Sequence, residues 1–180
     1  MRAASISVVP ELPEVETVRR GLEQRFVGRR ITRVEVGRER SVRRTSREEV
    51  IARLTGVQAL QAQRRGKYLL CPLSSGDSVM IHLRMSGQVL IDAVGSIRPP
   101  HSHVVMTLDD GNELRFVDPR TFGEVVVYNP DDDNPDAGTE SLVPEVARLG
   151  LDPLTGNFTF DAFRQRFTRG NRGVKALLLD

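Results

Sequence analysis

The chain has 180 residues, a hydrophobic content of 39%, a charged content of 28% and a formal net charge of +2. This length allows one well-formed core, or one domain and part of a second, and the sequence has no apolar run long enough to span a membrane. The single cysteine, Cys71, excludes an internal disulfide and a cysteine-rich zinc site within these residues.

The charged residues are unevenly distributed. Residues 19–67 hold fourteen arginines and one lysine against five acidic residues, a formal charge of +10, whereas residues 1–18 sum to −2 and residues 68–180 to −6. Such a basic block suits a polyanion, although a solvated surface explains the composition equally well. The chain has 24 arginines but only two lysines, Lys67 and Lys175. A lysine kept in so arginine-rich a chain indicates a site that needs an amine or ammonium group.

The first predicted element is an amphipathic helix. Pro13 suits its first turn because the missing N–H would be unpaired there. Apolar residues recur at helical spacing through Phe26, and Gly28 supplies a stop. Pro10 and Glu11 precede this helix and fill no obvious structural need, although a lone PxxP is most often only the start of a capped helix.

Short strands dominate the predicted structure of the following hundred residues. A capping box that begins at Ser46 predicts a second short helix, ended by Gly56. Alternating and apolar runs predict eight strands, at Ile31–Val36, Val57–Gln63, Tyr68–Leu73, Val79–Met85, Gln88–Ile91, Val104–Leu108, Glu113–Val117 and Glu124–Tyr128. Short strands with frequent turns favour an α+β fold, an antiparallel β-sandwich flanked by helices.

The last fifty residues differ in composition. Residues 129–140 are acidic and rich in proline and asparagine, which indicates a surface loop, and short helices are expected within Leu142–Leu149 and from about Thr159. The apolar, uncapped end at Asp180 predicts a chain cut within an element. We expect four parts: 1–9, an N-terminal extension too polar for a signal peptide; 10–130, the sandwich domain; 131–150, a linker; and 151–180, the start of a helical domain.

Five sequence blocks carry a resemblance to a known family. They are Pro10–Thr17, Arg64–Leu70, His82–Gly87, His101–Val104 and Asp118–Gly123. In this order they resemble the formamidopyrimidine-DNA glycosylases, bacterial repair enzymes that remove oxidised purines from DNA, and the resemblance runs from Pro10 to the last residue. Leu12 is typical of this purine branch, because the related endonuclease VIII-like enzymes for oxidised pyrimidines have glycine at this place.

The resemblance implies three catalytic residues. Pro10 would be the nucleophile, as the first residue of the mature protein. A terminal amine has a pKa of about 8, against about 10.4 for lysine, so more of it is unprotonated at neutral pH, and a secondary amine readily forms an iminium ion with a sugar. Glu11 is adjacent and suited to protonate the ring oxygen. Lys67 would lie near the phosphate and assist β-elimination, with an ordinary surface lysine as the alternative.

The resemblance assigns DNA contacts to six residues: Met85, His101, Arg120, Phe122, Arg172 and Lys175. A flipped base leaves a gap in the stack, and apolar or planar wedges fill such gaps. Met85, Arg120 and Phe122 would be these wedges, with Arg120 facing the orphaned cytosine. On their own, Met85 and Phe122 would more often be core residues, but the glycines beside them favour exposed loop tips.

Metal ions and other cofactors are not expected in this chain. His101 and His103 form an HxH pair, but the sequence shows no third ligand near them. By resemblance, the family's zinc finger and most of its helix-two-turn-helix element belong to a following half. The expected partner is double-stranded DNA that contains 8-oxoguanine, other oxidised purines or abasic sites. We expect the protein to act as a monomer in the bacterial cytoplasm and not to bind a membrane.

The sequence therefore predicts a base-excision repair glycosylase with abasic-site lyase activity through a Schiff base on Pro10. A non-catalytic DNA-binding fragment is the alternative, because Pro10 follows Val9, so that its nitrogen is an amide without a free lone pair, and because the family's C-terminal half is absent from this sequence. A glycosylase of the pyrimidine branch is disfavoured by Leu12. We expect translation to begin at Val9, since a GTG codon initiates as methionine, and removal of that methionine would free Pro10.

Overall fold

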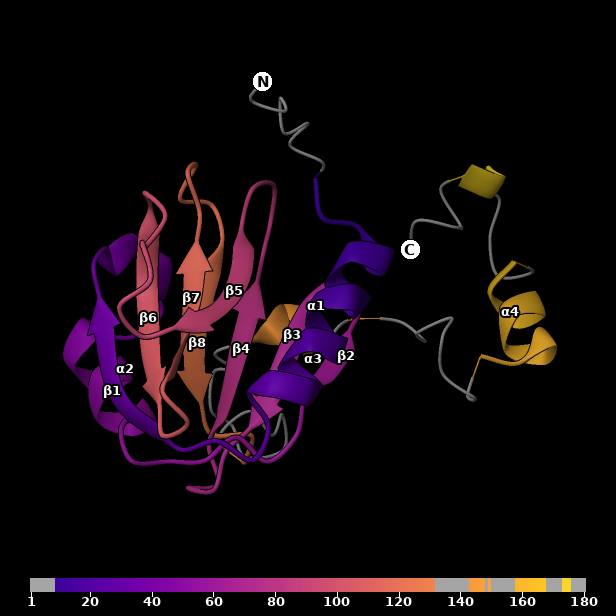
Figure 1. Cartoon of the computed structure of the whole chain (residues 1–180). Coiled ribbons are helices and arrows are strands. Elements are labelled where there is room, and N and C mark those ends of the chain that lie inside the picture. The colour runs from indigo at the N-terminus through magenta and orange to yellow at the C-terminus, as the bar shows by residue number, and fades with distance from the viewer. Residues whose placement is uncertain (1–8, 132–142, 148, 150–157, 168–172, 176–180) are drawn as a thin grey trace. The chain divides into compact units, whose positions relative to one another are not determined.

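A computed structural model describes residues 9–131, 143–147, 149, 158–167 and 173–175 (Figure 1). Contacts divide the chain into two units, Met1–Pro144 and Glu145–Asp180. Near their boundary lies α3 (Pro144–Ala147), and the second unit contains α4 (Phe160–Phe167). The hydroxyl of Thr159 accepts a hydrogen bond from the backbone N–H of Ala162 at 3.2 Å. Both short helices thus form where expected, while the finer domain boundaries stay a prediction.

Within the described part of the chain, eight strands form two four-stranded antiparallel sheets (Figure 1). One sheet has the order β1-β6-β7-β5 and the other β2-β3-β4-β8. The strands are β1 (Ile31–Val36), β2 (Gln63–Arg65), β3 (Tyr68–Pro72), β4 (Ser78–His82), β5 (Gln88–Ala93), β6 (Ser102–Leu108), β7 (Asn112–Val117) and β8 (Glu124–Tyr128). The predicted α+β fold class, an antiparallel sandwich with flanking helices, is confirmed.

Three helical elements accompany the sheets. They are α1 (Leu12–Arg25), the 3-10 helix η1 (Glu39–Val42) and α2 (Arg47–Leu54). Glu11 precedes α1, and its N–H donates to the Glu14 carboxylate at 3.0 Å, so the helix begins one residue before Pro13. The Ser46 hydroxyl accepts a hydrogen bond from the Glu49 N–H at 3.1 Å, as expected for the start of α2.

The predicted strand Val57–Gln63 is wrong over most of its length. The carbonyl of Val57 accepts from the N–H of Ile31 in one sheet at 2.8 Å, whereas the N–H of Leu60 donates to Pro72 in the other sheet at 2.9 Å. The segment passes from one sheet to the other and forms no continuous ladder with either. The predicted strand ending at Met85 is also too long, because Arg84 has a left-handed φ of 54°, which interrupts extended backbone.

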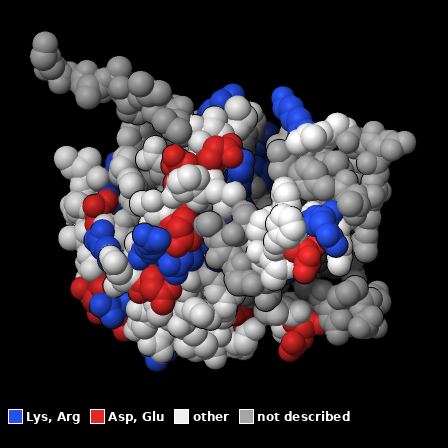
Figure 2. All heavy atoms as spheres, turned by 90° about the vertical axis from the view of Figure 1, so that its right-hand side faces the viewer, with Lys and Arg blue, Asp and Glu red and all other residues white. Residues whose placement is uncertain are grey.

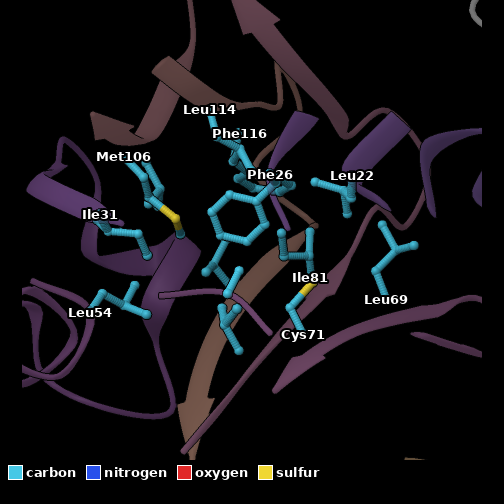
Figure 3. Close-up of a cluster of buried hydrophobic side chains, with 14 of the residues drawn as sticks. Leu22, Phe26, Ile31, Leu54, Leu69, Cys71, Ile81, Met106, Leu114 and Phe116 are labelled. Carbon is cyan, nitrogen blue, oxygen red and sulfur yellow. The ribbon is translucent and has the colours of Figure 1, made fainter. Parts of the chain in front are cut away.

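The core lies between the two sheets and the first two helices (Figure 3). Its largest fully buried apolar side chains come from every layer of the domain: Leu22, Phe26, Ile31, Leu54, Leu69, Ile81, Met106, Leu114 and Phe116. Figure 3 shows the Phe26 ring in the middle of the cluster. Both sheets are therefore anchored on a shared apolar interior.

Strand register brings several loops to one edge of the sandwich. Arg65 pairs with Tyr68, Tyr68 with His82, and His82 with Glu124, so these strand ends form one row. The loops 83–87 and 118–123 connect this row to the sheet β1-β6-β7-β5, at Gln88 of β5 and Val117 of β7, which pair with each other. We call this edge, with the turn 66–67 and the two loops, the site edge.

Candidate active site and DNA interface

Lys67 and Glu11 form an ion pair at the site edge. Lys67 lies in a two-residue turn between β2 and β3, in which Gly66 takes a φ of 57°, a value that favours glycine. Glu11 precedes the first residue of α1, and Pro10 is its neighbour. The three residues proposed for catalysis thus lie together, while in this chain the Pro10 nitrogen is bonded to Val9.

A second ion pair holds the lysine-bearing turn against α1. The Glu16 carboxylate accepts from Arg64 at 3.1 Å, and Arg64, only 5% exposed, also donates to the Gly66 carbonyl at 2.9 Å. Burial by itself raises the pKa of Glu16, but hydrogen bonds from Arg19, Arg64 and Arg20 outweigh it and lower that pKa. A charged Glu16 therefore fixes the position of the turn relative to the helix.

Part of the basic block is neutralised on α1 itself. Arg19 lies 3.2 Å from Glu23, and Arg20 lies 3.2 Å from Glu16. On the face shown in Figure 2, acidic and basic side chains lie beside one another. The block's excess positive charge must therefore be sought elsewhere in the domain.

Met85, Arg120 and Phe122 occupy the two loops of the site edge. Met85 is 41% exposed and Phe122 39% exposed, so the interpretation of both as core residues is wrong. The Arg120 guanidinium lies 5.2 Å from the centre of the Phe122 ring, within the range of a cation–π contact. Met85 and Phe122 line one pocket. The structure brings the three predicted wedge residues to neighbouring loop tips.

Asp118 connects these two loops. Its buried carboxylate accepts the hydroxyl of Ser86 from the first loop, and the N–H groups of Arg120 (3.2 Å) and Gly123 (2.7 Å) from the second. Gly123 also lies so close to the backbone of β4 that an added Cβ would be 2.9 Å from the His82 carbonyl oxygen. The sequence analysis did not identify Asp118, although it stands within one of the five resembling blocks.

Of the other three residues predicted to contact DNA, the structure describes His101 and Lys175 but not Arg172. His101 is exposed with a φ of 67°, directly before β6, whereas His103 is buried and its Nε2 bonds to the Asp118 carbonyl at 2.8 Å. Lys175 is exposed in the second unit, and Arg172 lies outside the described residues. The roles of these residues in DNA binding stay predictions.

Glu124, the first residue of β8, was also missed by the sequence analysis. Its side chain is fully buried and accepts two hydrogen bonds from Arg44, at 2.9 and 3.0 Å. Burial by itself raises the pKa of Glu124, but the hydrogen bonds and charges of the surrounding arginines outweigh it and lower that pKa. The only sequence signal was the basic block that contains Arg44.

Two features are absent from the part of the chain that the structure describes. The described residues contain no group of three or more His, Cys, Asp or Glu side chains placed to hold a metal ion. Among the same residues, no helix combines the length and apolar character needed to cross a membrane.

Comparison with known proteins identifies similar chains. A family profile described as formamidopyrimidine-DNA glycosylase N-terminal domain matches residues 9–125. The formamidopyrimidine-DNA glycosylase of a Nocardioides species is 45% identical over 96% of this chain and 57% of its own length, and that of Herpetosiphon aurantiacus is 42% identical over 96% and 60%. This chain thus spans about three fifths of the length of these curated relatives.

This chain is also similar to solved structures. The Lactococcus lactis formamidopyrimidine-DNA glycosylase bound non-covalently to DNA with an abasic site has 32% identity and a TM-score of 0.79, covering 94% of this chain and 62% of the other. The same enzyme in complex with DNA containing a formamidopyrimidine lesion gives 32% identity and a TM-score of 0.79, with 94% and 60% covered.

Proposed function

The chain belongs to the formamidopyrimidine-DNA glycosylase family, and from this premise we propose that it carries the catalytic part of an enzyme that excises oxidised purines from DNA and cleaves the abasic site. The single observation that carries this proposal is the ion pair of Glu11 and Lys67 beside Pro10. The reaction needs an amine, an acid and an ammonium group, and the ion pair places the last two side by side next to the residue whose nitrogen would be the amine.

The reaction begins at Pro10 once its nitrogen is free. The nitrogen lone pair attacks the anomeric carbon of the sugar, the bond to the base breaks, and the base leaves with the bonding electrons. As the amine attacks, its proton passes to the carboxylate of Glu11, and the resulting carboxyl group donates that proton to the ring oxygen as the sugar opens to an iminium ion. Loss of a proton from the adjacent carbon to solvent then breaks the bond to the 3′ phosphate, which leaves with the bonding electrons and whose charge the ammonium group of Lys67 stabilises.

The exposed loop tips supply the second part of the proposal. Met85 and Phe122 enter the gap left by the flipped base, and Arg120 faces the unpaired base on the opposite strand. Their support is exposure: partly exposed apolar side chains of this size at neighbouring loop tips suit insertion between bases better than packing. Double-stranded DNA with oxidised purines or abasic sites is therefore the proposed partner.

Borohydride trapping tests the amine. The full-length gene product, prepared with Pro10 as its first residue, should form a covalent adduct with DNA that contains an abasic site, because borohydride reduces the iminium ion to a stable amine. Matched protein that retains residues 1–9 should trap poorly, and Pro10→Gly in the first protein should weaken trapping. Efficient trapping by protein verified to retain residues 1–9 would refute Pro10 as the nucleophile and point to Lys67.

One observation favours a second function. In this chain the Pro10 nitrogen is acylated by Val9 and cannot attack a sugar. If mass spectrometry of the native protein finds Met1 as the first residue and no adduct forms, the protein is a non-catalytic DNA-binding module.

A further inference from the structure

A second feature of the site edge has no part in the proposed chemistry. A pocket of about 620 Å³ lies beside the wedge residues, and it is lined by Arg40, Arg43, Arg84, Met85 and Phe122. Its cationic side comes from η1 and the residue after it, and from the loop that follows β4. Three arginines and two exposed apolar side chains thus share one cavity.

Glu124 organises the arginines from below. Besides Arg44, it accepts Arg84 at 3.1 Å and lies 3.4 Å from Arg43, while its own side chain is 0% exposed. One carboxylate shared by three guanidinium groups leaves a formal charge of +2. The side chains of Arg43 and Arg84 are 39% and 36% exposed although the carboxylate itself is buried, so both remain partly open to solvent, while the Nε of Arg84 is buried without a hydrogen-bond partner.

Arg40 adds a further positive charge to the pocket. Its side chain makes no hydrogen bond or ion pair within the described residues. Its neighbour Glu39 is 73% exposed and lies 3.6 Å from Arg47 instead. The pocket therefore combines two guanidinium groups held by Glu124 with a third that has no such partner among the described residues, and two arginines of the basic block, Arg40 and Arg43, line it.

We propose that this pocket binds a backbone phosphate of DNA next to the base step that Met85 and Phe122 enter, with Arg40 and Arg43 as direct ligands and Glu124 as the positioning residue. Guanidinium groups match phosphate oxygens with paired N–H donors, and the apolar side chains flank the place where a base adjoins its phosphate. The inference rests on the proposed function only in taking DNA as the partner.

Salt dependence of DNA binding tests the pocket. The 180-residue chain is titrated with a short duplex, undamaged or with an abasic-site analogue, between 25 and 100 mM NaCl. Each lost phosphate contact lowers the slope of log affinity against log salt by about 0.9. Arg40→Gln combined with Arg43→Gln removes both ligands of this one phosphate and should reduce the magnitude of the slope by about 0.9, so that the affinity ratio of unmodified chain to variant falls about 3.5-fold across this fourfold salt range.

Arg29→Gln is the matched control. Arg29 is 41% exposed and paired with Asp110, as Arg43 is 39% exposed and paired with Glu124, but it lies by the β6–β7 turn at the opposite edge. This variant should keep the original slope. The loss in the double variant should be equal for both duplexes, because phosphate contacts carry no base information.

Arg43→Lys tests the paired donors, because it keeps the charge and loses the guanidinium group. Its salt slope should stay near the original while its affinity falls severalfold. Glu124→Gln tests the positioning role and, if circular dichroism shows that it is folded, should lower the affinity for both duplexes as well. An unchanged slope in the double variant, or an equal change in Arg29→Gln, overturns the phosphate site. These measurements need no free Pro10 amine, so their failure is separate from failure of trapping.

Discussion

Asp118→Asn is expected to weaken both loops of the site edge at once. The carboxylate is fully buried and accepts three donors, and an amide oxygen and nitrogen cannot replace two carboxylate oxygens. Whichever way the amide is turned, the N–H of Gly123 or that of Arg120 loses its acceptor. A buried donor without a partner costs about 1–3 kcal/mol.

The remaining hydrogen bonds also become weaker, because bonds to a charged acceptor contribute about 1 kcal/mol more than neutral ones. Relief of the buried negative charge offsets part of this loss. We therefore expect the free energy of unfolding to fall by about 2 kcal/mol. Urea titration followed by circular dichroism measures the change.

Asp109→Asn is the control for this experiment. Asp109 is exposed and accepts one backbone N–H, from Arg30 at 3.1 Å, which an amide oxygen can also do. Its cost should stay below about 0.5 kcal/mol. A cost of that size for Asp118→Asn would show that the three hydrogen bonds do not hold the two loops together.

Three further predictions follow from burial and charge. Phe26→Ala should cost about 3–5 kcal/mol of unfolding free energy, whereas Phe122→Ala should cost less than about 1 kcal/mol and yet impair lesion processing by the full-length protein; a large stability loss in the second variant would assign Phe122 to packing. The arginines lower the pKa of Glu124 despite its burial, so its stabilisation is complete above the ordinary glutamate pKa and is lost as the pH falls through the lowered value. The unfolding free energy should then drop in acid, and a Glu124→Gln variant that drops as steeply would contradict this. Burial, with a smaller contribution from Glu23, raises the pKa of the Cys71 thiol to about 12, so a thiol reagent at pH 8 should label it only after unfolding.

Local sequence patterns predicted most elements well. The strands Ile31–Val36 and Glu124–Tyr128 have the predicted bounds, and the Ser46 cap forms as expected. These elements depend on neighbours a few residues away, which a sequence window contains. The predicted strand from Val57 failed because its backbone partners, Ile31 and Pro72, belong to different sheets. No local pattern records that division.

Some residues of the site were likewise predicted from the sequence, and others were not. The resembling blocks named Glu11 and Lys67, and the fold then joined them in an ion pair. The acidic residues that organise the loops, Asp118 and Glu124, went unnoticed because an isolated acidic residue in a sequence gives no sign of its partners.

The sequence alone determined the family, the periodicity of the strands and the residue types available for chemistry, because these depend on the identity and short-range order of side chains. Only the tertiary structure decided which charges are buried and paired. Arg44 and Glu124 are eighty positions apart, and a carboxylate at that distance becomes a buried partner only when η1 and β8 are packed together. Burial and charge pairing arise from contacts between distant segments, and these contacts exist only once the chain has folded.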